Sequence, residues 1–135
     1  MKRLILLLLL ALASRGAMAE WVAVVNVDGT TSYANPATIR KQGSKVRMWD
    51  MNDYSNHQKL TGNSYQSMLL LTEYDCKEEK FRSLHLSVHR RNMGDGNLLY
   101  ATDANDMWRP VLSRSVGEAL LKFACNKSNG LDLSY

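Results

Sequence analysis

The stretch FRSLHLSVHRR, residues 81–91, carries the clearest alternation of apolar and polar side chains in this 135-residue chain. Three apolar positions alternate with three polar ones: Leu84, Leu86 and Val88 against His85, Ser87 and His89. Successive side chains of a strand point to opposite faces, so a period of two predicts a strand with one covered face. The surrounding fold should therefore contain a sheet that is packed on one side.

Strands are predicted on either side of this stretch. Residues 65–76 precede it across the charged run 77–80, and residues 98–102 follow it across a turn at 93–97 that contains two glycines. Glycine adopts positive φ at no steric cost, which suits such a turn. Short connections of this kind favour hairpins and therefore an antiparallel sheet.

The first strands are predicted near residue 20. Residues 21–27 are apolar and rich in β-branched side chains, and the Asp28-Gly29 pair after them is a strong hairpin signal. The return strand would cover residues 31–34. These patterns place a hairpin at the start of the sheet.

The segment that follows is predicted to be less regular. The Asn35-Pro36 pair indicates a turn, with one helical turn that ends near residue 43. Residues 45–53 alternate as a half-exposed strand does, and residues 54–64 are polar and predict a surface loop. The expected strands then number about six.

A helix is predicted near the C-terminus. Ser115-Val116-Gly117-Glu118 has the form of a capping box, with serine as N-cap and glutamate three residues later. The apolar residues that follow have the spacing of one buried helical face: Val116, Ala119, Leu120, Phe123 and Ala124. We therefore expect an α+β domain, an antiparallel sheet of about six strands with a C-terminal helix packed on one face.

The first 19 residues have the pattern of a secretory signal peptide, which leaves residues 20–135 as the working domain. Lys2 and Arg3 precede an unbroken apolar run at 4–13, and small residues stand at 17 and 19. The apolar run is too short for a transmembrane anchor. A lipid anchor is not expected either, because the first cysteine is Cys76.

Removal of this segment changes the charge of the protein. The whole chain has 17 basic and 13 acidic residues, a formal charge of +4. Three basic residues lie within residues 1–19, which leaves 14 against 13 and a net charge of +1. Net charge therefore gives no support for nucleic-acid binding.

Two cysteines, Cys76 and Cys125, remain in the working domain. An even number in an oxidising compartment favours a disulfide, and two buried free thiols are the alternative. Cys125 lies near the end of the predicted helix, so a Cys76–Cys125 bridge would tie that helix to the sheet. No C-x-x-C motif is present, which argues against a redox-active dithiol.

No pattern predicts catalysis, a cofactor or a metal. His85 and His89 share a strand face but stand roughly 13 Å apart at strand rise, too far to ligate one ion. The acidic residues near the 77–80 turn, Glu73 among them, are interpreted as solvated surface. The sequence contains no G-x-S-x-G motif and no glycine-rich loop directly before a helix. We therefore expect a protein that is not an enzyme.

Arg90 and Arg91, at the end of the amphipathic strand, are the candidate binding residues. Arginine beside exposed Tyr or Trp is typical of protein-binding surfaces. Arg47 beside such aromatic residues would have the same character. The alternative interpretation is a basic strand end that contributes to solubility.

Several islands of sequence, in order over about residues 21–126, resemble the bacterial surface-adhesin protein E family. They are Trp21-Val22, SYANPATIRKQG (32–43), VRMWDMNDY (46–54), EYDC (73–76), Arg82, MGDG (93–96) and WRPVLSRSVGEALLKFAC (108–125). The resemblance implies a flanked antiparallel sheet of about six strands with a helix fastened by the disulfide. It also implies binding to host extracellular-matrix or plasma proteins, and possible dimerisation.

Two functions follow from these expectations. The first is an exported binding protein of the adhesin E type, periplasmic or at the cell surface, with a Gram-negative bacterium as the expected source. The alternative is a periplasmic inhibitor or envelope-accessory protein that inserts a loop, at residues 54–64 or 93–97, into its target. Both functions have a protein as the partner.

Overall fold

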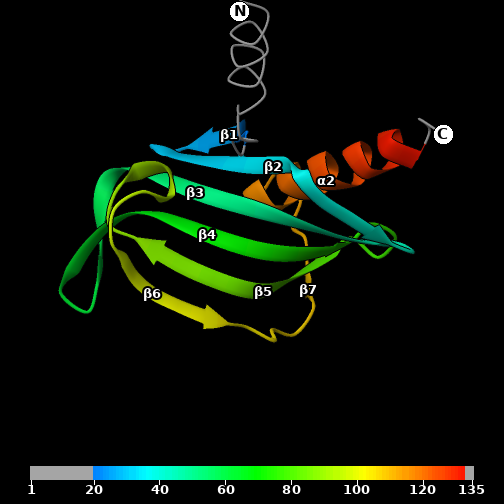
Figure 1. Cartoon of the computed structure of the whole chain (residues 1–135). Coiled ribbons are helices and arrows are strands. Elements are labelled where there is room, and N and C mark those ends of the chain that lie inside the picture. The colour runs from blue at the N-terminus through cyan, green and yellow to red at the C-terminus, as the bar shows by residue number, and fades with distance from the viewer. Residues whose placement is uncertain (1–19, 133–135) are drawn as a thin grey trace, which may run out of the picture.

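A computed structural model describes residues 20–132 and shows a curved sheet with one helix beside it (Figure 1). The strands are β1 (Val22–Val27), β2 (Thr30–Gln42), β3 (Lys45–Leu60), β4 (Asn63–Asp75), β5 (Lys80–His89), β6 (Leu98–Asp103) and β7 (Arg109–Pro110). The helix is α2 (Val116–Asp132), and a short 3-10 turn, η1 (Asn92–Gly94), precedes β6. The predicted signal peptide, residues 1–19, lies outside the described residues.

The sheet is an antiparallel meander in which each strand pairs with its neighbour in sequence, in the order β1-β2-β3-β4-β5-β6. The two-residue strand β7 pairs with the start of β5. The predicted antiparallel sheet of about six strands with one C-terminal helix is confirmed, and β7 is an addition that the sequence patterns did not indicate.

The prediction of a surface loop over residues 54–64 is wrong. β3 continues to Leu60, the chain reverses at Thr61 and Gly62, and β4 begins at Asn63. Thr61 and Gly62 have φ of 45° and 82°, the left-handed values that a two-residue hairpin turn requires. The hairpin extends past the core, so both of its faces are open to solvent and its residues are polar. The polar composition therefore resembled that of a loop.

The predicted turn and helical turn over residues 35–43 are also wrong, because β2 continues to Gln42. Its pairing with β3 is interrupted between Asn35 and Arg40, so the extra residues form a bulge in the strand. The Thr38 hydroxyl holds the bulge, since it donates to the Asn35 carbonyl (2.7 Å) and accepts from the Trp49 amide (3.0 Å). Pro36 is tolerated there because it lies in the bulge, where its missing backbone N–H is not needed for pairing with β3.

The strand that contains the alternating stretch has one irregularity. Leu71 of β4 pairs with His85 and Thr72 with Ser83, so Leu84 is the extra residue of a bulge. Beyond the bulge, Leu86 opposes Leu70 on the side of α2, and the predicted alternation holds. Before the bulge the pattern shifts by one residue, so that Phe81 and Ser83 face α2 and Arg82 faces the other side of the sheet.

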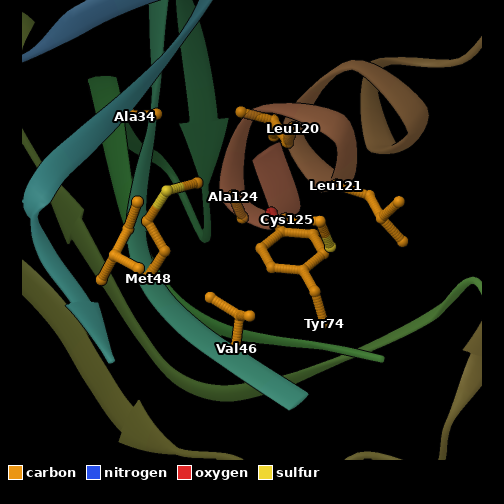
Figure 2. Close-up of a cluster of buried hydrophobic side chains, with 9 residues drawn as sticks. Ala34, Val46, Met48, Tyr74, Leu120, Leu121, Ala124 and Cys125 are labelled. Carbon is orange, nitrogen blue, oxygen red and sulfur yellow. The ribbon is translucent and has the colours of Figure 1, made fainter. Parts of the chain in front are cut away.

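The hydrophobic core lies between α2 and the part of the sheet formed by β1 to β4 (Figure 2). Its buried members come from three strands and the helix: Ala34, Ile39, Val46, Met48, Tyr74, Leu120, Leu121, Ala124 and Cys125. Burial of each large apolar side chain contributes about 2 kcal/mol. The predicted helix face is confirmed at Leu120 and Ala124, and Leu121 joins it.

The start of α2 and its covalent attachment are as predicted. The Ser115 hydroxyl accepts a hydrogen bond from the Glu118 amide at 3.1 Å, which satisfies one free N–H of the first turn. Cys76 and Cys125 form a disulfide with their Cα atoms 5.9 Å apart. The bridge joins the end of β4 to the middle of α2. No helix within residues 20–132 has the length and apolar character needed to cross a bilayer.

Candidate protein-binding face

The sheet face opposite α2 carries the most prominent group of charged and aromatic side chains. Met48 is fully buried under α2, so its neighbours Arg47 and Trp49 point to the other side of β3. We call this side the open face. Its residues on the three central strands include Arg47, Trp49, Leu71, Glu73, Arg82 and His85.

Three arginines and one glutamate form a transverse line on the open face. Arg40 of β2 lies directly opposite Arg47 of β3. Arg47 lies opposite Glu73 of β4, which in turn lies opposite Arg82 of β5. Directly opposed residues on one sheet face are close enough for their side chains to interact. We call these four residues the arginine row.

Glu73 holds the centre of the arginine row. Its side chain is only 6% exposed, and its Oε2 accepts from Arg47 Nε at 2.8 Å. Its Oε1 accepts from Arg82 Nη2 at 2.7 Å and Nε at 2.9 Å. Burial by itself would raise the pKa of Glu73, but the bonds from the two guanidinium groups outweigh it and hold that pKa below its ordinary value. The interpretation of Glu73 as solvated surface is therefore wrong.

Trp108 borders the arginine row. β7 places Arg109 opposite Phe81, so Trp108 lies next to Arg82 on the open face. The Arg82 guanidinium stands 4.7 Å from the centre of the indole ring, and Lys45 Nζ stands 5.9 Å from it. Stacking on an aromatic ring restricts the guanidinium and leaves it less entropy to lose on binding.

Two shallow hollows flank the row. One, of about 330 Å³, is lined by Arg40, Lys41, Gln42, Lys45, Arg47 and Glu73. The other, of about 350 Å³, is lined by Ala37, Thr38, Arg40, Arg47, Trp49 and Leu71. The first is strongly basic and the second is partly apolar, a combination that protein-binding surfaces use.

The far end of the open face is covered by the η1 segment. The Met93 amide donates to Asp53 at 2.7 Å, and the Gly94 amide donates to Ser67 Oγ at 2.9 Å. Met93 adopts a left-handed φ of 59° in this turn. The segment therefore shields Ser67 and Met51, which are fully buried although α2 lies on the opposite side of the sheet.

Arg90 and Arg91, the candidate binding residues from the sequence, are exposed beside η1. Their amides donate to the carbonyls of Asn97 (3.0 Å) and Asp95 (3.1 Å), which fixes the backbone of this connection. They lie at the opposite end of β5 from Arg82, about 25 Å away at strand rise. The structure does not bring them together with the arginine row, and their role in binding stays a prediction.

The three histidines each have a polar neighbour. His85 Nδ1 lies 2.8 Å from Asp103 Oδ1, His89 Nε2 lies 2.9 Å from Ser87 Oγ, and His57 Nδ1 lies 2.9 Å from Ser64 Oγ. The His85 ring also meets Trp49 edge to face at 5.7 Å. Within residues 20–132, no three His, Cys, Asp or Glu side chains gather closely enough to hold a metal ion.

The sequence patterns indicated Arg47 as a possible surface cation but did not indicate the row. Arg40, Arg47, Glu73 and Arg82 are separated by as many as 42 positions in the chain and meet only through strand register. The one available signal was the position of Glu73 within a predicted strand, where a charged residue needs a partner.

This architecture defines a small α+β domain, a meander sheet with a disulfide-tethered C-terminal helix on one face and a basic, aromatic open face. Residues 21–126 match the sequence model of the family described as surface-adhesin protein E, and the chain belongs to that family. Membership of a surface-adhesin family implies an exported protein.

Solved structures of Haemophilus influenzae protein E are similar in fold. Crystal form II of that protein superposes with a TM-score of 0.63 at 7% identity, over 84% of this chain and 92% of that chain. A second structure of the same protein gives a TM-score of 0.61 at 8% identity, over 82% and 86% of the two chains. No curated protein sequence matches the chain. At such identity the likeness concerns the fold.

Proposed function

We propose that this chain is an exported, non-enzymatic binding protein of the bacterial envelope that contacts other proteins through its open face. Host extracellular-matrix or plasma proteins are the proposed partners, in keeping with the family. The observation that carries the proposal is the arginine row beside Trp108 and Trp49. Arginine and tryptophan are the residues most enriched at the energetic centres of protein interfaces.

The rigidity of the face supports this function. Arg47 and Arg82 are held by Glu73, and Trp49 is held by its contact with His85 and by the Thr38 hydroxyl bond to its amide. A surface that is already ordered loses less side-chain entropy when a partner docks. The disulfide and α2 hold the sheet on the side opposite the open face.

The test is binding of the purified exported protein to a panel of immobilised extracellular-matrix and plasma proteins. Trp49→Ala should weaken binding at least tenfold, because a half-buried aromatic anchor is lost. Lys122→Ala, on the exposed side of α2, is the matched control and should bind as the unmodified protein does. Absence of binding to every panel member, or equal binding by Trp49→Ala, contradicts the proposal.

Location is tested separately by protease treatment of intact cells. Cleavage of the protein on intact cells is expected for a protein displayed at the surface. Complete protection, with cleavage only after the outer membrane is opened, would place it in the periplasm and favour the inhibitor or accessory function. In that case the exposed β3–β4 hairpin turn at Thr61 and Gly62 is the segment to test against a target enzyme.

A further inference from the structure

Arg40 and Arg47 stand directly opposite each other on neighbouring strands, on the same face. Like charges in this position destabilise a sheet. Glu73 bonds Arg47 and Arg82, but within residues 20–132 no carboxylate forms an ion pair with Arg40. The Arg40 guanidinium donates instead to the Ala37 and Ile39 carbonyls, at 3.2 and 2.8 Å. An anionic ligand bound between Arg40 and Arg47 would offset the charge of Arg40, which no carboxylate of residues 20–132 pairs.

Positive charge is concentrated at this end of the open face. The hollow of about 330 Å³ is lined by four basic residues and one acidic residue, Glu73, which is already bonded to two arginines. Residues 20–135 as a whole carry a net charge of only +1. An anionic group entering the hollow would meet several cations, among them Arg47, which Glu73 already holds in place.

The spacing of the basic residues favours anions whose charges have a matching separation. Lys45 and Arg47 are two residues apart on β3 and share the open face, so their backbone positions are about 6.6 Å apart. In an extended peptide, side chains at alternate positions have the same separation. The bond from Arg47 to Glu73 shows that the Arg47 side chain binds a carboxylate in its present conformation.

We propose that Arg40, Arg47 and Lys45 bind an extended acidic segment of the partner protein, with Asp or Glu at alternate positions. The inference rests on the proposed function and names the chemistry that the open face recognises. One carboxylate would lie between Arg40 and Arg47, where it relieves their repulsion. The next would meet Lys45.

The probes are two synthetic octapeptides of equal composition, four Glu and four Ser, one alternating and one with the four Glu in a block. Fluorescence anisotropy with the full exported protein should show the alternating peptide binding several-fold more tightly. Arg40→Gln and Lys45→Gln should each lower its affinity about three- to tenfold. Both residues are exposed, so the fold is expected to tolerate both changes. Lys122→Gln is the charge-matched control.

Equal affinity for the two peptides, or unchanged affinity in Arg40→Gln and Lys45→Gln, overturns the inference. Tighter binding of heparin than of the alternating peptide, with loss of the peptide preference, would assign the site to polyanions in general and overturn it as well. If the peptides fail while Trp49→Ala still abolishes capture of a panel protein, this inference is wrong and the proposed function stands. If the peptides bind but no panel protein does, the proposed function is wrong, whereas the preference of the open face for acidic peptides stands.

Discussion

Asp50 lies under α2, is 4% exposed and forms no ion pair among the described residues. The Tyr74 hydroxyl donates to its Oδ2, and its Oδ1 has no hydrogen-bond partner among the described residues. Burial raises the pKa of Asp50 from its ordinary 3.8 to about 7, although the Tyr74 bond opposes this rise. Burial and the neighbouring Asp50 also raise the pKa of Tyr74. A carboxyl in this position favours its neutral form.

The stability of the domain should therefore fall as pH rises between about 4 and 7. Below this range Asp50 is neutral in both states, and above it the carboxyl is charged in both. Within the range only the unfolded chain ionises, which favours unfolding by about 4 kcal/mol in total. Urea unfolding at pH 5 and pH 8 should show roughly 2.5 kcal/mol of this loss, because the unfolded chain is already mostly ionised at pH 5.

Asp50→Asn should flatten this pH dependence and raise stability at pH 8, because the amide is neutral at every pH. Asp28→Asn, at an exposed turn position, is the matched control and should keep the slope of the unmodified protein. An Asp50→Asn protein with the original slope would show that another group causes it.

Glu73 is the opposite case, a buried carboxylate that stays charged. Glu73→Gln removes the charge from both of its ion pairs and should cost about 1–3 kcal/mol, moderated because Arg47 is half exposed. The lowered pKa of Glu73 makes its contribution complete above its ordinary pKa of 4.5 and lost as pH falls below it. The measurement is chemical unfolding at pH 7, with the exposed Glu78→Gln as control. Equal stability of the two variants would contradict the assignment.

At the scale of elements, α2 depends on its covalent attachment. The disulfide closes a loop between residues 49 positions apart, which in the chain-entropy view stabilises the fold by about 4 kcal/mol. The variant Cys76→Ala with Cys125→Ala should lower the free energy of unfolding by roughly that amount. The unmodified protein under reducing conditions should unfold at the same urea concentration as the variant, and a difference between them would point to packing effects of the substitutions.

The start of α2 is a second local determinant. Ser115→Ala removes the hydroxyl that accepts from the Glu118 amide and donates to the Leu112 carbonyl at 2.6 Å. The expected loss is about 1 kcal/mol, the usual value of an N-cap. Thermal unfolding measures it, with the exposed Ser113→Ala as control. Equal melting temperatures would mean that solvent replaces the cap without cost.

At the scale of the whole molecule, the sheet has a covered part and a part that extends past the core. Residues 46, 48 and 50 of β3 are buried, whereas residues 55–57 are exposed. Amide exchange should therefore be slowest near Met48 and faster by at least tenfold in the hairpin beyond residue 54, because exposed backbone hydrogen bonds open more readily. Hydrogen exchange followed by NMR tests this, and uniform protection along β3 would contradict it.

Local features of the sequence determined much of the fold. Asp28-Gly29 predicted a tight hairpin, and both residues have the positive φ that this turn needs. Ser115 predicted the start of α2, and the spacing of Leu120 and Ala124 predicted its buried face. The even number of cysteines favoured a disulfide between Cys76 and Cys125 over two free thiols, and the disulfide is present. The turn and helix inferences depend on neighbours within a few residues, and the disulfide inference depends on the number of cysteines.

Tertiary structure alone decided where the strands continue and which residues meet. Within the polar 54–64 segment, residues 58–60 pair with residues 63–65 of β4 across the turn, and the residues after Pro36 are strand because β3 receives them across a bulge. The bulges near residues 36–39 and at Leu84 also set the register of the arginine row. A slip of one residue at either bulge would turn an arginine to the other face. Register depends on pairing between distant segments, so the local sequence could predict a sheet but not the row that crosses it.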